Sequence, residues 1–592
     1  MNRRGPARDN REKPKNKRYV LKRLWDYLFK FKWMILTALL LTILSNLFSL
    51  VGPLLSGYAI DAIELGVGNV DFNKVILFAS LMLIFYILSS ILSFILSRLM
   101  TKIGKTIVYQ MRKDAFDKMS IMPISYFDNN QIGDIISKFN YDIDTVNTSL
   151  SSDLIQICTS VVTIIVSFVM MCIISPIMVL VFLITIPISV LFTKFMIKKT
   201  TPLFRNRSRK LGELNGFVEE MISGNKTIKA YGKEEDIIKK FDEYNNISVE
   251  ATYNAEYYGA ITGPGVNFVN NLSLSLICVL GAILCINGQI TLGNIQSFVQ
   301  YSKKFSGPIN EIANLFTDLQ SALAAGERVF SLIDGESEPV DLKDAKDLVE
   351  IEGNVRFENV KFGYEKNKTI IHNLNFEATK GKVIAIVGPT GAGKTTIVNL
   401  LMRFYDIDNG DIFVDNNKIL DITRKSLRKG YAMVLQDTWL FQGSIYENVR
   451  YGKDDATSED VINACKAAKI HNYIVHLKDG YDTILTDGGV NISKGQKQLL
   501  TIARAYLLNS NMLILDEATS NVDTRTEIQI QEAMTNLMKD KTCFIIAHRL
   551  STIQHADLIL VVKDGDIIEK GNHYELLKNK GFYYELDQSQ FK

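Results

Sequence analysis

The residues of this chain that are best suited to bind a phosphate group follow an apolar run in the segment "KVIAIVGPTGAGKTTIVNLL". Gly388 to Thr395 fit the pattern G-x-x-x-x-G-K-[ST], between a predicted buried strand and a predicted helix. Glycines let the backbone wrap a phosphate, and the start of the helix adds a favourable electrostatic field. Lys394 then reaches the β and γ phosphates, and the Thr395 hydroxyl can bind Mg²⁺. The predicted nucleotide contacts are Gly388, Pro389, Thr390, Gly391, Ala392, Gly393, Lys394, Thr395 and Thr396.

Two adjacent acids provide the second half of this chemistry. "MLILDEATS" is an apolar strand that ends in Asp516 and Glu517, so both carboxylates should emerge where ligands bind in open α/β folds. Asp516 suits the coordination shell of Mg²⁺, and Glu517 suits a general base that polarises the attacking water. The alternative is that the two acids only cap the next helix.

A third segment, "NISKGQKQLL", begins another predicted helix. Ser493, Gly495 and Gln496 are of the types found at a helix start that faces phosphate. Lys494 stands where a close approach to phosphate would favour glycine. The segment therefore raises the question of whether it belongs to a working, an altered or an unrelated site.

The first 320 residues must form membrane helices, because stretches of about twenty apolar residues recur there and this length crosses the hydrocarbon core. The predicted spans are 34–55, 75–96, 154–174, 177–192, 266–286 and, most weakly, 292–315.

Polar residues interrupt the last two spans. Asn270, Asn271, Gln296 and Gln300 could line a translocation path or could only hold helices together. Lys303 and Lys304 are expected at the cytoplasmic end of the last span rather than in the path.

Charge sets the predicted orientation. The first 23 residues carry ten Lys or Arg and precede an uncharged stretch from 34 to 56. Such a run could bind nucleic acid, but beside a membrane span it is better explained as a cytoplasmic flank. The connections after the second and fourth spans also begin with basic residues. We therefore predict a multi-pass protein of the cytoplasmic membrane, with both termini in the cytoplasm and no nucleic acid partner.

Those two cytoplasmic connections are long and show helical spacing of apolar residues. We expect helices that extend beyond the bilayer, with tips near residues 125–130 and 224–235, where Gly, Asn and Asp break the pattern. After a polar linker, alternating strands and helices with frequent Gly indicate a soluble α/β domain. The six cysteines show no metal-ligand spacing and are interpreted as reduced packing residues.

With these motifs together, nearly the whole chain resembles an ABC exporter half-transporter. The resemblance implies an all-α six-helix transmembrane domain of the type I ABC exporter kind, followed by an α/β P-loop nucleotide-binding domain that hydrolyses ATP with Mg²⁺. The expected divisions are a basic arm at 1–23, the transmembrane domain at 24–325, a linker at 326–350 and the ATP-binding cassette at 351–592.

The resemblance also assigns four further residues. Tyr364 in "VKFGYE" matches the aromatic residue that stacks on adenine, and Gln436 in "MVLQD" matches the glutamine that contacts Mg²⁺. Asp523 in "SNVD" matches the loop that crosses to the second nucleotide domain. His548 in "IIAHRL" matches the catalytic histidine that contacts the γ-phosphate.

In the family that this chain resembles, the signature loop Leu-Ser-Gly-Gly-Gln closes on ATP held by the opposite subunit. Here Ser493, Gly495 and Gln496 keep that pattern, whereas Lys494 replaces its first glycine. Our hypothesis is a heterodimer with one degenerate site, in which a second half-transporter supplies an intact signature. The alternative is a homodimeric exporter that tolerates Lys494 in its signature.

The predicted activity is ATP-driven export of lipophilic or amphipathic compounds, with multidrug export as the main expectation. A lipid flippase on the same scaffold and a nucleotide-gated channel are the competing functions. Glu517, the predicted general base, and His548 argue against a channel that does not pump.

Overall fold

Long helices account for nearly all of the first of two units into which the chain divides. The computed structural model describes residues 16–63, 70–365, 368–435, 438–486, 489, 491–516, 523–546 and 553–590. The first unit comprises residues 1–122 and 130–336, and the second comprises 123–129 and 337–592.

The helices of the first unit match the predicted membrane segments. They are α1 (Lys17–Phe29), α2 (Lys32–Asp61), α3 (Phe72–Ser120), α5 (Ile132–Ser137), α6 (Ile143–Thr148), α7 (Leu154–Ile174), α8 (Pro176–Ser223), α9 (Asn225–Ala230), α10 (Glu234–Ile286) and α11 (Leu292–Ile333), with π-helical turns at Lys138–Asp142 and Ser149–Asp153. Five candidate spans are found among the described residues, in α2, α3, the segment Ile132–Ile174, α8 and α10. The sixth predicted span lies in α11, which is 42 residues long but is not among these five.

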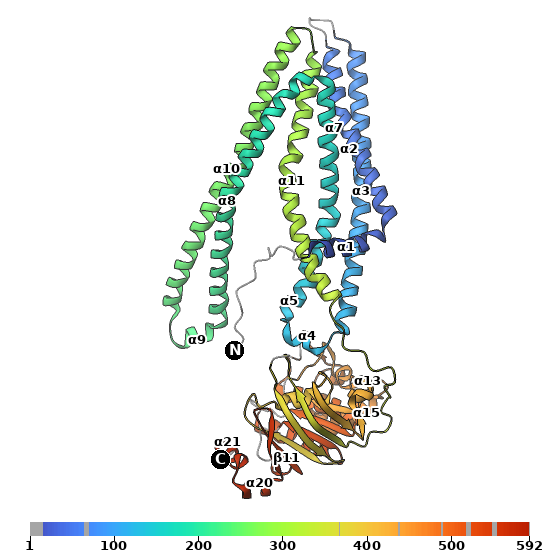
Figure 1. Cartoon of the computed structure of the whole chain (residues 1–592), viewed down its shortest axis with the longest axis vertical. Helices are drawn as coiled ribbons and strands as arrows, with labels where there is room; N and C mark the ends of the chain where they lie inside the picture. Colours follow the sequence, from blue (N-terminus) through green and yellow to red (C-terminus); the bar gives the residue numbers. More distant parts are fainter. Residues whose placement is uncertain are drawn as a thin grey trace. The chain divides into compact units, whose positions relative to one another are not determined.

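Three of these helices are much longer than a membrane requires. α3, α8 and α10 contain 49, 48 and 53 residues, so each is roughly 70 to 80 Å long at about 1.5 Å per residue, against about 30 Å of hydrocarbon. α3 ends at Ser120 and α8 at Ser223, next to the two predicted tips. Figure 1 shows α8 and α10 as an antiparallel pair, with α2, α3, α7 and α11 grouped beside one another.

The end of α2 is joined to the start of α11. Asp61 accepts hydrogen bonds from the Thr291 hydroxyl and the Gly293 N–H, both at 2.7 Å. A Cβ atom on Gly57 would lie 2.6 Å from the carbonyl oxygen of Gly293, and one on Gly293 would lie 2.1 Å from that of Gly57. Only glycine at both positions allows these two backbones to approach so closely. The end of α2 and the start of α11 therefore lie at the same height along the helix bundle.

The described part of the second unit contains three β-sheets. The main sheet has the order β12-β11-β3-β10-β9-β6 and is parallel except for its edge strand β12. An antiparallel sheet has the order β2-β1-β4-β5, and β7 pairs with β8. The strands are β1 (Val355–Phe362), β2 (Ile371–Ala378), β3 (Val383–Val387), β4 (Asn409–Val414), β5 (Asn417–Lys418), β6 (Tyr431–Val434), β7 (Gly443–Ser444), β8 (Ile484–Leu485), β9 (Met512–Asp516), β10 (Thr542–Ile546), β11 (Leu558–Lys563) and β12 (Asp566–Gly571).

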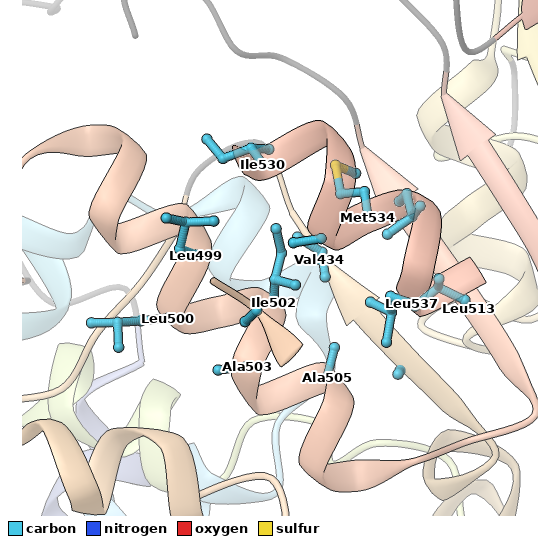
Figure 2. Close-up of a cluster of buried hydrophobic side chains, with 14 of the residues drawn as sticks. Val434, Leu499, Leu500, Ile502, Ala503, Ala505, Leu513, Ile530, Met534 and Leu537 are labelled. Carbon is cyan, nitrogen blue, oxygen red and sulfur yellow. The ribbon is translucent and has the colours of Figure 1, made fainter. Parts of the chain in front are cut away.

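Helices cover both cores of this unit. They are α4 (Ile124–Asn129), α12 (Lys394–Leu401), α13 (Arg424–Lys429), α14 (Ile445–Arg450), α15 (Ser458–Ala467), α16 (His471–Val475), α17 (Lys494–Leu508), α18 (Thr524–Met538), α20 (His573–Asn579) and α21 (Phe582–Gln590). One apolar core packs α12 between the main and antiparallel sheets. The other packs α17 and α18 together, with Leu499 and Ile502 against Ile530 and Leu537 (Figure 2).

Candidate functional site

The phosphate loop connects the carboxyl end of β3 to α12. Gly388, Gly391 and Gly393 have φ values of 156°, 86° and 104°, a region that residues with a Cβ atom rarely adopt. A Cβ on Gly388 would also lie 2.1 Å from the carbonyl oxygen of Val562. Gly393 is the N-cap of α12 and no side chain caps that helix, so its first N–H groups suit an anion.

Lys394 is buried at the first position of α12 and folds back over the loop. Its ammonium donates to the carbonyl oxygens of Gly388 and Pro389, at 2.8 and 2.9 Å. Burial lowers the pKa of Lys394, and the charge of Asp516 acts in the opposite direction. A buried ammonium of this kind gains stability when an anion arrives, because the anion favours its charged form. Thr395, next in the chain, is exposed, and Thr396 is buried.

Tyr364 lies beside the same helix. Its hydroxyl donates to the Thr396 hydroxyl at 3.3 Å, and the Asn399 amide donates to the Tyr364 oxygen at 3.0 Å. Tyr405 packs edge-on to the ring, with centroids 4.8 Å apart and planes at 85°. The side chain of Tyr364 remains 43% exposed, so an aromatic surface is held next to the phosphate loop.

Tyr405 makes a second contact that the sequence did not indicate. Its hydroxyl donates a hydrogen bond to the Asp128 carboxylate. Asp128 lies in α4, which belongs to the second unit although it follows α3 in the chain. Burial, together with this hydrogen bond, raises the pKa of Tyr405. A segment between two membrane helices is thereby attached to the aromatic residues beside the phosphate loop.

The remaining predicted catalytic residues follow strands that end at one edge of the main sheet. Asp516 is the last residue of β9 and pairs in register with Ile546 of β10, which pairs with Ile386 of β3. Because parallel strands end at the same edge, Asp516 and the phosphate loop share it. Glu517 follows β9, His548 follows β10 and Gln436 follows β6. These three residues lie outside the described parts of the chain, and the predictions made for them stay predictions.

The altered signature forms the start of α17. Ser493 is the N-cap, and its hydroxyl accepts from the N–H of Gln496 while the Gln496 side chain accepts from the N–H of Ser493. Gly495 is buried and Lys494 is exposed at the first helical position. Because Lys494 has an ordinary helical backbone, glycine is not required there for conformation. The substitution changes bulk and charge at the helix start.

Asp523 caps α18, where its carboxylate accepts from the N–H of Thr526 at 2.9 Å. This backbone hydrogen bond lowers the pKa of Asp523. α18 packs against α17 in the core drawn in Figure 2, so Asp523 and the start of the signature helix are positioned by the same pair of helices.

Among the polar residues of the last spans, Gln300 contacts another helix. Gln300 donates to the Ser56 hydroxyl at 3.0 Å, which supports the role of holding helices together for this residue. Asn271 is exposed, while Asn270 and Gln296 are half-buried.

The contacts of Lys304 favour a deeper position than the cytoplasmic end of the last span that was predicted for it. Lys304 is twelve residues from Leu292, the start of α11, and contacts Ser49 in the apolar part of α2. The sixth predicted span is only weakly apolar, so the sequence does not fix how deep Lys304 lies within it.

Known proteins match both units. A family model described as "ABC transporter transmembrane region" matches residues 35–309, and one described as "ABC transporter" matches residues 371–520. An uncharacterized ABC transporter ATP-binding protein of Bacillus subtilis is 42% identical over 582 residues, covering 98% of this chain and 96% of that protein.

Two further relatives carry names that refer to cargo. A fatty acid ABC transporter ATP-binding/permease protein of Mycobacterium bovis is 41% identical over 522 residues, covering 88% of this chain and 82% of that protein. A Bacillus subtilis protein whose name proposes multidrug export is 34% identical over 571 residues, covering 96% and 98%. The solved structure of a bacterial Atm1-family ABC exporter with ATP bound has a TM-score of 0.75 and 28% identity, covering 95% of this chain and 98% of that one.

Proposed function

This chain belongs to the ABC transporter family, and from that membership we propose that it exports lipophilic or amphipathic molecules across the cytoplasmic membrane, with multidrug export as one form of this activity. The ABC transporter domain makes the protein an ATPase coupled to transport. The observation that carries the proposal is the presence, in one chain, of a helical membrane unit and a phosphate loop whose glycines adopt positive φ values before a helix. Both termini and the nucleotide domain are proposed to be cytoplasmic.

The membrane helices support a lipophilic cargo. Apolar side chains dominate the cluster around Phe182, Phe298 and Phe305. Among the described residues, no group of three or more His, Cys, Asp and Glu is placed to hold a metal ion. Relatives named for fatty acids and for multidrug export agree with this class of cargo.

The residues of the nucleotide site have distinct proposed roles. Lys394 and the N-terminus of α12 bind the phosphates, and Tyr364 offers its ring to adenine. Thr395, Asp516 and Gln436 would hold Mg²⁺, which supplies positive charge to the phosphate oxygens. Glu517 orients and polarises the attacking water, and His548 contacts the γ-phosphate. ATP binding closes two such domains and hydrolysis resets them.

The partner is proposed to be a different half-transporter. Lys494, exposed at the start of α17, adds a long cationic side chain where the resemblance places the partner's ATP. Its charge favours binding of the phosphates while its bulk opposes the close approach needed for hydrolysis. One site of the dimer would then hydrolyse slowly and the other would use the Lys394 and Glu517 of this chain.

Purified transporter in proteoliposomes tests the export function. We expect ATP-dependent uptake of a fluorescent lipophilic dye or a labelled fatty acid into inside-out vesicles. Movement of labelled phospholipid alone would support a lipid flippase, and ion conductance without uptake would support a channel.

The dimer is tested with this chain purified alone. We expect low ATPase activity without a second half-transporter, so robust cooperative ATPase and transport by the chain alone would contradict the heterodimer. Lys494→Gly serves as a comparison, because a homodimer inhibited by Lys494 should gain activity from it.

A further inference from the structure

A half-buried cationic side chain lies in the contact between α2 and α11. The ammonium of Lys304 on α11 donates to the hydroxyl of Ser49 at 3.1 Å and to its backbone carbonyl at 3.4 Å. One turn earlier, Gln300 donates to Ser56. Ser297 and Tyr301 of α11 also donate to α2, to the carbonyl oxygens of Pro53 and Leu50 at 2.9 and 2.6 Å. Polar contacts therefore run along this helix pair beside the apolar side chains that pack it.

Counts along both helices agree on a position of the ammonium near the middle of the bilayer. Lys304 is twelve residues from the start of α11, and Ser49 is twelve residues from Asp61 at the end of α2. Asp61 holds these two helix ends at one level through Thr291 and Gly293. At about 1.5 Å per residue, both counts give about 18 Å, whereas membrane and head groups together span about 40 to 45 Å.

The contacts of Lys304 leave its charge unbalanced. An ammonium carries three N–H donors, and the two acceptors found belong to one neutral serine. Among the described side chains, no carboxylate forms an ion pair with Lys304. The next acidic position on α11, Glu311, lies seven residues and about 10 Å further along the axis.

Placing an ammonium charge inside a membrane costs free energy. The contact between the two helices does not require this charge. Gln300 and Ser56 show that a neutral pair joins the same helices. Ionisable residues within spans are retained mainly where they meet a cargo or an ion. A lysine that forms no ion pair with the described carboxylates suits a cargo that brings the negative charge itself.

We propose that Lys304 is the counter-ion in a cargo site and that the cargo is an amphiphile with an anionic head group, such as a long-chain carboxylate. This inference rests on the export function proposed above and names the class of cargo. The Lys304 ammonium pairs with the head group, Ser49 orients the lysine, and the alkyl chain lies against the apolar side chains of the bundle.

The experiment compares four amphiphiles of one chain length in the purified transporter, reconstituted in nanodiscs. Displacement of a bound fluorescent fatty acid by oleate, oleyl alcohol and oleylamine measures binding, and stimulation of ATPase measures coupling. Oleyl phosphate distinguishes a phosphate from a carboxylate head group. The variants are Lys304→Gln, which keeps a donor for Ser49, and Ser49→Ala, which keeps the charge. Lys303→Gln is the matched control, because Lys303 is exposed and points to another face of the helix.

We expect the wild type to prefer oleate or oleyl phosphate to the alcohol, and Lys304→Gln to lose about tenfold in affinity for the anions only, about the effect of one partly buried charge pair. Lys303→Gln should behave as the wild type. Ser49→Ala should keep the preference for anions, because the charge remains, with a smaller loss of affinity because the lysine is no longer oriented. Equal binding of acid and alcohol by the wild type, or an unchanged preference in a folded Lys304→Gln, overturns the inference while leaving export intact. Anion-selective binding without ATPase stimulation or transport would instead contradict the proposed function.

Discussion

Substitution of Gly388 by alanine tests whether the phosphate loop works in the conformation described. The added Cβ would lie 2.1 Å from the carbonyl oxygen of Val562, a backbone atom of β11. Contacts under 3.0 Å are essentially never seen for a Cβ, so the loop must move by about 1 Å. The φ value of 156° adds strain, on the order of 1 to 3 kcal/mol.

A shift of this size occurs where the phosphates must be aligned. Misplacement by about 1 Å can lower a rate by about a hundredfold, and we expect this loss in kcat of Gly388→Ala. ATP affinity should fall as well, because the loop N–H groups move with the backbone. Steady-state ATPase in nanodiscs and titration with a fluorescent ATP analogue measure the two effects.

Gly381→Ala is the matched control. Gly381 precedes β3, whereas Gly388 follows it. Its φ of 73° is also unfavourable for alanine, but a Cβ there would meet nothing within 4 Å. This variant should lose about 1 to 2 kcal/mol of stability and keep its kcat. If Gly388→Ala retains wild-type ATPase and ATP affinity, the geometric reasoning is refuted.

Three further changes have defined outcomes. Glu517→Gln should leave ATP binding intact and nearly abolish turnover, and undiminished ATPase would reject Glu517 as the base. Tyr405→Phe removes the hydrogen bond to Asp128; cargo moved per ATP should fall severalfold while ATPase persists, and unchanged coupling would show that the contact is dispensable. The lowered pKa of Asp523 means that its cap stabilises above the unfolded pKa of about 4 and is lost as the pH falls through the folded value. Asp523→Asn should therefore lose this part of the pH dependence of Tm, and identical pH profiles would contradict it.

The sequence predicted the local features well because each depends on neighbouring residues. The apolar run 154–174 has the same bounds as α7, and the glycine pattern marks the turn after β3. Ser493, predicted at a helix start, is the N-cap of α17 and forms a capping box with Gln496, three positions later.

Contacts between distant residues could not be predicted in this way. Lys304 and Ser49 are 255 positions apart, and Tyr405 and Asp128 are 277 positions apart. No periodic pattern in one sequence links such positions. The depth of Lys304 is hard to predict because hydropathy alone does not fix where a weakly apolar helix enters the bilayer.

The glycine contact between Gly57 and Gly293 has a mechanical consequence. No side chain lies between the two glycines, and Asp61 bridges the same helix ends. We therefore expect α2 and α11 to move together as one rigid unit and not to separate. A gate that opens between these two helices would have to break that junction. Cargo must then reach Lys304 from the flank of the pair, and the moving boundaries of the pathway must lie along other helices.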